Sequence, residues 1–299
     1  MAQELLIPES WTVDQLNADR LISERLFTDI RREEGPRSFS RVYEALEPRV
    51  RDILKKTHDL REFHGQLFLD DPDAWQGCRY LCAPPISQED LWTIVGNSKF
   101  VRVPPRLADQ VADAMRVVLD PVRFPWLVSG RAPTEAEREA AIMSSTVLWS
   151  SQHLSTERRG ESSHRQEAAT AGLLLSVGME LEESRASINF IDDMRRGTYS
   201  KERRIAGAKC DVPIRLRDGR LLALECKVSN GPKNGWKRVV REVGGKADLW
   251  RTKFGSQILT GVVIAGVFDL SCLVGAQEAG VALFWEHDLS TLSEFVGRS

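Results

Sequence analysis

The segment of residues 208–231, AKCDVPIRLRDGRLLALECKVSNG, constrains the fold of this chain more than any other. Apolar side chains recur at every second position on each side of a central Asp218-Gly219 pair, at Val212, Ile214, Leu216, Leu222, Leu224, Cys226 and Val228. Successive side chains of a β-strand point to opposite faces, so this alternation predicts two strands that each have one apolar face. The ionisable residues Asp211, Glu225 and Lys227 fall at the alternate positions. The segment therefore predicts a β-hairpin whose second face carries two acids and one base.

The length of the hairpin loop decides whether these ionisable side chains share a face, because a shift of one residue turns a strand over. A two-residue loop would pair Val212 with Glu225 and so mix apolar and ionisable side chains on both faces. A three-residue loop, Asp218-Gly219-Arg220, would pair Asp211 with Lys227 and keep the two kinds of side chain apart. Three-residue hairpin loops commonly carry a left-handed glycine, so we predict a loop of odd length, or a bulge with the same effect.

Two carboxylates and an ammonium on one face suit a metal site that cleaves phosphodiesters. Carboxylates are hard oxygen ligands, and Mg²⁺ prefers a few of them together with water and a phosphate oxygen. Such a metal neutralises charge that develops on the phosphate and lowers the pKa of a bound water. Lys227, two residues beyond Glu225, would orient that water or stabilise charge. The alternative is a structural ion pair between Lys227 and the acids, although buried like charges without a metal would be costly.

The spacing resembles the D-(x)n-(D/E)-x-K signature of the PD-(D/E)XK nuclease superfamily, because Asp211 is followed after thirteen residues by Glu225-Cys226-Lys227. The resemblance covers about residues 158–290. It implies a restriction-endonuclease-like α/β fold, in which helices flank a mixed sheet. It also implies that the two acids and the main-chain carbonyl of Cys226 bind Mg²⁺, and that in-line attack of water on DNA leaves 5′-phosphates. Cys210 stands where the name-giving proline of the family would be.

Many members of that superfamily carry a further acidic residue on the first core helix. In RRGESSHRQEAATAGLLLSVG, Glu167 lies in the middle of a helix predicted over Ser163–Val177, and we expect it to be catalytic. Glu161, nearer the start of that helix, is the alternative. A solvated helix glutamate is the other interpretation of either residue.

Basic residues are concentrated in one part of the chain although the net charge is -2. Residues 195–253 hold 17 Lys and Arg against 6 Asp and Glu, which predicts a polyanionic partner or, alternatively, an ordinary solvated basic face. We expect four residues near the site or its flanking loop to contact DNA phosphates, namely Lys209, Arg215, Lys233 and Lys237. A helix predicted over Asn234–Lys253 has one apolar stripe, at Trp236, Val239, Val240, Val243, Ala247 and Trp250. Its other face carries Lys237, Arg238, Arg241, Lys246 and Arg251.

The first 155 residues indicate helices instead. Ile22, Leu26 and Ile30 recur at helical spacing, and Thr134 with Glu137 is a capping box that opens a helix through about His153. We expect a helical N-terminal domain over residues 1–155, used in DNA recognition or dimerisation, and a PD-(D/E)XK catalytic domain over residues 156–299.

The layout of the whole chain, with CAPPISQEDLW and RRGESSHRQE, resembles the XamI-type restriction endonucleases. This resemblance implies a type II enzyme that cuts double-stranded DNA at a short palindrome, and a DNA methyltransferase that protects the host genome. A palindromic target calls for a homodimer with one active site for each strand. One alternative is a DNA repair or junction-resolving nuclease that uses the same residues. The other is a DNA-binding protein without turnover.

No stretch approaches the roughly 18 apolar residues that a membrane span needs, and the first residues lack the pattern of a secretory signal. The five cysteines are odd in number and irregular in spacing, which favours free thiols in a reducing compartment. We therefore expect a bacterial cytoplasmic protein. A zinc site formed by Cys78 and Cys82 with His58 and His64 is an alternative use of two of these thiols.

Overall fold

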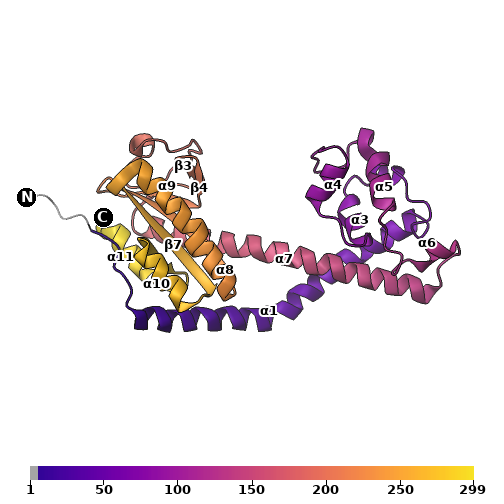
Figure 1. Cartoon of the computed structure of the whole chain (residues 1–299), viewed down its shortest axis with the longest axis horizontal. Helices are drawn as coiled ribbons and strands as arrows, with labels where there is room; N and C mark the ends of the chain where they lie inside the picture. The colour runs from indigo at the N-terminus through magenta and orange to yellow at the C-terminus, as the bar shows by residue number, and fades with distance from the viewer. Residues whose placement is uncertain (1–5) are drawn as a thin grey trace, which may run out of the picture. The chain divides into compact units, whose positions relative to one another are not determined.

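The computed structural model describes residues 6–299 (Figure 1). The chain divides into two compact units. The helical unit is Glu34–Arg158, and the sheet unit joins the described residues before it to Arg159–Ser299. Two long helices, α1 (Val13–Lys56) and α7 (Glu135–Ser176), contribute residues to both units. The boundary expected near residue 155 lies close to the end of the helical unit, whereas the residues before Glu34 group with the C-terminal half.

Helix α7 is continuous where the sequence pattern predicted one helix through about His153 and another over Ser163–Val177, with Gly160 in the segment between them. The capping box at its start is confirmed, since the Thr134 N–H donates to Glu137 Oε2 at 2.8 Å and the Glu137 N–H donates to Thr134 Oγ1 at 3.3 Å. The predicted break was wrong because one exposed glycine costs a helix only about 1 kcal/mol, which the long flanking segments outweigh. Within the described part of the chain, no helix is both long and apolar enough to cross a bilayer.

Short helices complete the helical unit. They are α2 (Gln66–Asp70), α3 (Trp75–Cys78), η1 (Arg79–Leu81), α4 (Gln88–Ile94), η2 (Pro105–Leu107), α5 (Ala108–Arg116) and α6 (Pro125–Ser129). Together with their parts of α1 and α7 they enclose a core rich in aromatic side chains, including Phe63, Phe68, Phe124 and Trp126. The unit therefore has a hydrophobic core of its own.

A six-stranded mixed sheet forms the centre of the sheet unit, in the order β1-β2-β5-β6-β7-β8. The strands are β1 (Glu180–Leu181), β2 (Thr198–Tyr199), β5 (Val212–Arg215), β6 (Leu221–Asn230), β7 (Ile258–Val267) and β8 (Val281–Trp285). β5 pairs antiparallel with β2 and β6, whereas β6, β7 and β8 run parallel. A separate antiparallel hairpin consists of β3 (Arg203–Ile205) and β4 (Ala208–Cys210). This architecture is compatible with the expected restriction-endonuclease-like α/β fold.

Helices cover both faces of the sheet. The helical segments are η3 (Ile191–Asp193), α8 (Pro232–Trp236), the π-helical η4 (Lys237–Val243), α9 (Gly244–Phe254), η5 (Gly255–Gln257), α10 (Leu270–Glu278) and α11 (Ser290–Arg298). The C-terminal part of α7 and α11 pack on one face, where Leu222 and Leu224 of β6 are buried. On the other face lie η4, α9, α10 and the start of α1, whose Leu16 is fully buried (Figure 1). Ser23 of α1 accepts a hydrogen bond from the Gly266 N–H at 2.8 Å, which explains why this end of α1 belongs to the sheet unit.

The hairpin between β5 and β6 keeps the predicted faces but not the predicted pairs. Val212 pairs with Leu224, and the Leu216 N–H donates to the Arg220 carbonyl at 2.9 Å. The loop is thus Arg217-Asp218-Gly219, of odd length as predicted, with Gly219 at φ +97°. It starts one residue earlier than expected, so every pair is displaced by two positions and the predicted pair of Asp211 with Lys227 was wrong. A displacement of two returns each side chain to the same face.

Candidate active site

Asp211 lies at the bend between β4 and β5, where the chain leaves the small hairpin and enters the main sheet. The β5–β6 ladder ends at the pair of Val212 with Leu224. Two residues farther along β6, the main-chain N–H of Cys226 donates to Asp211 Oδ2 at 2.8 Å. The carboxylate therefore takes the place of a strand partner, and this hydrogen bond fixes its orientation against β6.

Glu225 and Lys227 reach the same place from β6. The Lys227 ammonium lies 2.7 Å from Asp211 Oδ2 and 2.8 Å from Glu225 Oε2, so that one cation joins the two acids. The three side chains share one face, as the alternation predicted. Glu225 is fully buried, and its Oε1 has no hydrogen-bond partner among the described residues. A buried carboxylate oxygen without a partner is costly, and it marks a position where a cation or a water would bind favourably.

A fourth member of the cluster, Lys246 of α9, was missed by the sequence analysis. Its ammonium donates to Glu225 Oε2 at 2.7 Å. The helical pattern assigned Lys246 to the exposed basic face, yet it follows Val243 by three residues and precedes Trp250 by four, and both of these side chains are fully buried. Neighbours three and four residues apart share a helix face, so this spacing was the available signal.

Burial and charge act in opposite directions on these groups. Burial, and after it the negative charge of Asp211, raises the pKa of Glu225, while Lys227 and Lys246 oppose the shift. Burial alone would lower the pKa of Lys227, but Glu225 and Asp211 outweigh it and the net pKa is raised. Lys227 is therefore charged at neutral pH. Burial raises the pKa of the Cys226 thiol, so this residue offers the site its main-chain groups and not a thiolate.

The expected third acid, Glu167, lies on α7 and accepts a hydrogen bond from Ser163 Oγ at 2.9 Å. Its negative charge is the third-largest cause of the raised pKa of Cys226, after burial and Asp211. Within the described residues, no hydrogen bond or ion pair joins Glu167 to the cluster of Asp211, Glu225 and Lys227. Glu161, the alternative, is exposed and lies six residues earlier on α7.

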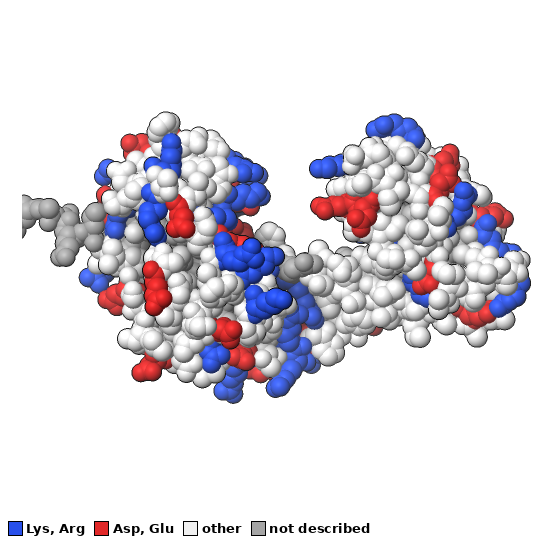
Figure 2. Space-filling view, viewed as in Figure 1, with Lys and Arg blue, Asp and Glu red and all other residues white. Residues whose placement is uncertain are grey.

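The four basic residues expected at DNA differ in their surroundings. Arg215 is buried, with its guanidinium 2.7 Å from Asp192 and hydrogen-bonded to the Gly219 carbonyl. The expectation that Arg215 contacts DNA phosphates was therefore wrong, because its side chain is not at the surface. Lys209 is exposed and pairs with Glu202 at 2.8 Å. Lys233 and Lys237 are exposed and line an open pocket of about 400 Å³ at the end of β6. Figure 2 shows Lys and Arg side chains gathered near α8, where this pocket lies.

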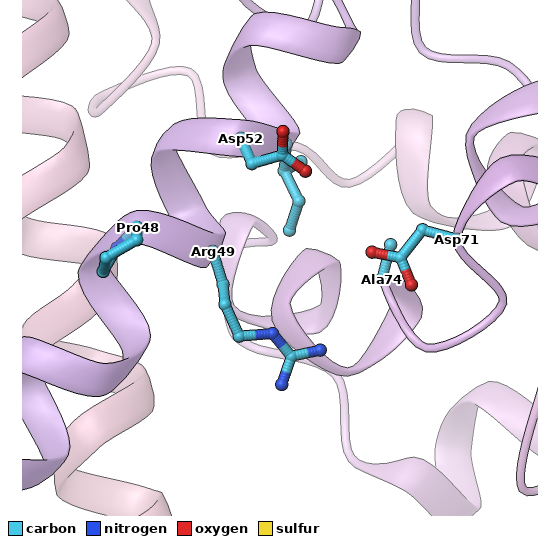
Figure 3. Close-up of a pocket in the computed structure, with 6 residues that line it drawn as sticks. Pro48, Arg49, Asp52, Asp71 and Ala74 are labelled. Atoms are coloured by element: carbon cyan, nitrogen blue, oxygen red, sulfur yellow. The ribbon is translucent and has the colours of Figure 1, made fainter.

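A second pocket, of about 170 Å³, lies in the helical unit between α1 and the segment that precedes α3 (Figure 3). Arg49, Asp52 and Asp71 line it. Asp52 pairs with Lys56 at 2.7 Å, and Asp71 Oδ1 accepts from the Asp73 N–H at 3.1 Å. Both carboxylates are thus satisfied within the unit, and the mixed charge of the lining favours no class of ligand.

The residues of the main cluster suit a hard divalent cation. Among residues 6–299, no three side chains of His, Cys, Asp or Glu converge to make a complete metal cage. That finding also leaves Cys78 and Cys82 as buried free thiols. Asp211 and Glu225 supply two carboxylates, and Mg²⁺ sites typically use one or two, with waters and substrate phosphates completing the shell. The unpartnered Oε1 of Glu225 fits such a ligand.

Comparison with known proteins agrees with this chemistry. The model of the XamI restriction endonuclease family matches residues 58–285, which is well over half of the chain. The type II restriction enzyme XamI of Xanthomonas campestris pv. amaranthicola is 32% identical over 263 residues, which cover 83% of this chain and 93% of that enzyme. The type II restriction enzyme SalI of Streptomyces albus G is 21% identical over 312 residues, covering 95% and 96%. No solved structure gives a significant match.

Proposed function

Because the chain belongs to the XamI restriction endonuclease family, we propose that it is a type II site-specific deoxyribonuclease that uses Asp211, Glu225 and Lys227 to hydrolyse phosphodiester bonds. One observation carries the assignment of the site. The Lys227 ammonium lies within 2.8 Å of two carboxylates, one from the bend before β5 and one from β6. A salt bridge needs only one acid, whereas a second acid on the same face adds a hard oxygen ligand of the kind that Mg²⁺ binds.

In this proposal Asp211, Glu225 and the main-chain carbonyl of Cys226 hold Mg²⁺. The N–H and C=O of one residue in a β-strand point to the same side of the strand. Since the Cys226 N–H donates to Asp211, its carbonyl faces the Asp211 side as well. The bound metal would lower the pKa of a water and neutralise charge on the phosphate.

The protein groups then have separate tasks. Lys227, kept charged by its two acids, orients the attacking water and stabilises the phosphate in the transition state. Water would attack the phosphorus on the side opposite the 3′ oxygen, which is the leaving group, so hydrolysis would leave a 5′-phosphate and a 3′-hydroxyl. Glu167 is the candidate third acid, at the α7 side of Cys226, with Glu161 as its alternative.

Three exposed cations, Lys209, Lys233 and Lys237, would bind the DNA backbone. The last two face a single pocket beside the end of the strand that carries Lys227, so a phosphate next to the scissile one would meet them. The helical unit would contribute DNA recognition or dimerisation. We place the protein in the bacterial cytoplasm, paired with a DNA methyltransferase.

A short palindromic target would be cut by a homodimer, with one active site on each strand. The exposed apolar side chains Ile22, Leu26 and Ile30 of α1 offer a surface that a second copy would cover. Sedimentation of the purified protein with and without DNA measures this stoichiometry directly.

Plasmid DNA incubated with the purified chain and Mg²⁺, followed by sequencing of the ends, tests the activity. Discrete fragments with one common end sequence support restriction. Preferential cutting of branched or damaged substrates would assign the site to repair or junction resolution. A DNA shift in EDTA without any cutting when Mg²⁺ or Mn²⁺ is added would leave only a DNA-binding protein.

A further inference from the structure

Lys246 neutralises one of the two acids without belonging to the strand motif. Glu225 Oε2 accepts from two ammoniums, Lys227 at 2.8 Å and Lys246 at 2.7 Å, while Oε1 accepts from no described residue. Lys227 is shared with Asp211, but Lys246 contacts only Glu225 among the acids of the site. The two negative charges of Asp211 and Glu225 are thus balanced within the cluster by the two positive charges of Lys227 and Lys246.

The helix aims Lys246 at this position. Val239, Val243 and Ala247 are buried at spacings of four residues, so they lie along one face of the helix. The π-helical segment η4 ends at Val243, three residues before Lys246, and α9 continues from there. Trp250, one turn later, is fixed because its Nε1 donates to the Ile205 carbonyl at 3.0 Å. The backbone beneath Lys246 is therefore held on both sides.

The Lys246 side chain lies at the edge of the site, where its ammonium pairs with Glu225 and lies 6.0 Å from the centroid of the Trp250 ring. It is 25% exposed, whereas Glu225 is completely buried, so its ammonium lies at the boundary between the site and solvent. Four methylenes connect the ammonium to the helix, and lysine carries three donors that bind a phosphate as readily as a carboxylate. Nothing comparable holds for Lys227, which is 13% exposed and is tied to two acids.

We propose that Lys246 is a built-in counter-cation, which competes with the divalent metal for Glu225 and weakens metal binding until DNA phosphate draws the ammonium away. This inference rests on the metal site of the proposed function. An ammonium on one oxygen of a carboxylate repels a second cation at the same carboxylate, and low-dielectric surroundings strengthen the repulsion. Since coupling between two ligands is reciprocal, DNA would tighten metal binding and metal would tighten DNA binding.

Titration of Mn²⁺ into the full-length protein without DNA, followed by calorimetry, tests the competition directly. Lys246→Gln keeps a donor for Glu225 but removes the charge, and we expect it to bind Mn²⁺ about tenfold more tightly than the wild type. Lys246→Arg keeps the charge and should bind no more tightly than the wild type. Lys253→Gln is the matched control, because Lys253 lies on the same helix against the Phe190 ring and should leave the affinity unchanged.

Thermal unfolding gives a second measurement that tolerates a destabilised variant. Tighter binding stabilises more, so Mn²⁺ should raise the melting temperature of Lys246→Gln, relative to EDTA, by more than it does for the wild type. Equal or weaker Mn²⁺ affinity of Lys246→Gln, with an equal or smaller thermal shift, would overturn the inference.

Glu225→Gln separates this failure from failure of the proposed function. If wild-type protein binds Mn²⁺ and Glu225→Gln does not, the metal site stands whatever Lys246 does. If Glu225→Gln binds Mn²⁺ as well as the wild type, the metal site itself is refuted, and the competition at Glu225 falls with it.

Discussion

Cys226 and Asp211 are joined across the end of a β-ladder, with the main-chain N–H of one donating to the side-chain Oδ2 of the other at 2.8 Å. An aspartate that accepts from a strand amide cannot turn away from that strand. The bend before β5 thus presents its carboxylate to the same face as Glu225 of β6.

Asp211→Asn should separate the structural and chemical parts of this contact. The amide oxygen of asparagine still accepts from Cys226, so the thermal stability in EDTA should change little. The negative charge is lost, and we expect the cleavage rate in Mg²⁺ to fall by about 10²-fold or more, the size expected when one charge-stabilising group is removed. Single-turnover cleavage and a melting curve of the same preparation measure the two effects. Cleavage near the wild-type rate would remove Asp211 from the active site.

Lys227→Met should abolish cleavage and also destabilise the metal-free protein. Glu225 and Asp211 would then be like charges with only Lys246 to compensate, and breaking a buried ion pair costs about 3 kcal/mol. Urea unfolding in EDTA measures the loss. The double variant with Glu225→Gln should recover part of it, because the buried repulsion is gone. A single variant as stable as the wild type would contradict the ion-pair geometry.

Metal binding should weaken at a higher pH than an ordinary glutamate would allow. Glu225 has its pKa raised above 4.5 by burial and by Asp211, so the folded protein takes up the proton that blocks a metal earlier as the pH falls. The stability of the metal-free protein, measured in EDTA, should change with pH in the opposite direction. The contribution of this group to stability is fully present below pH 4.5 and is lost as the pH rises through the folded-state pKa. Mn²⁺ affinity, and the melting temperature in EDTA, each measured from about pH 4.5 to 8, should show these opposite trends, and the trend of the melting temperature should disappear in Glu225→Gln.

Lys237→Gln and Arg215→Met should affect different measurements although both remove one positive charge. Lys237 is exposed beside the pocket at the end of β6, and its loss should lower the slope of log affinity against log salt for DNA by about one. Arg215 is buried, and its guanidinium binds the exposed Asp192 and the Gly219 carbonyl, so its loss should lower stability by about 1 kcal/mol or more while the slope stays unchanged. Titrations of duplex DNA at several salt concentrations, with urea unfolding, distinguish the two. A reduced slope for Arg215→Met would show that this guanidinium reaches DNA.

The alternation of apolar residues predicted β5, β6 and the cluster of Asp211, Glu225 and Lys227, because a repeat of two residues can be recognised from the sequence alone. It could not show that Asp211 lies at a bend outside the strand. Nor could it fix the pairing, since two loops of odd length preserve the same faces and only their closing hydrogen bonds differ.

Long-range packing accounts for the other differences. Arg215 is buried because Asp192, from a distant loop, reaches its guanidinium, and no local pattern encodes that meeting. The start of α1 joins the sheet unit through Leu16 and Ser23, whereas periodicity predicts a helix but not its partner. Lys246 was assigned to solvent together with the other basic residues of its helix, although its spacing from the buried Val243 and Trp250 places it toward the sheet.

The two faces of β6 have different tasks, one in the hydrophobic core and the other in the active site. Cys226 serves the site through its peptide group while its side chain fills the hydrophobic core beneath α7 and α11. Alanine, valine or serine there would alter how the layers fit and leave the peptide group in register. Substitutions at even-numbered positions such as Cys226 can therefore adjust the stability of the core, while Glu225 and Lys227 on the opposite face keep their places in the site.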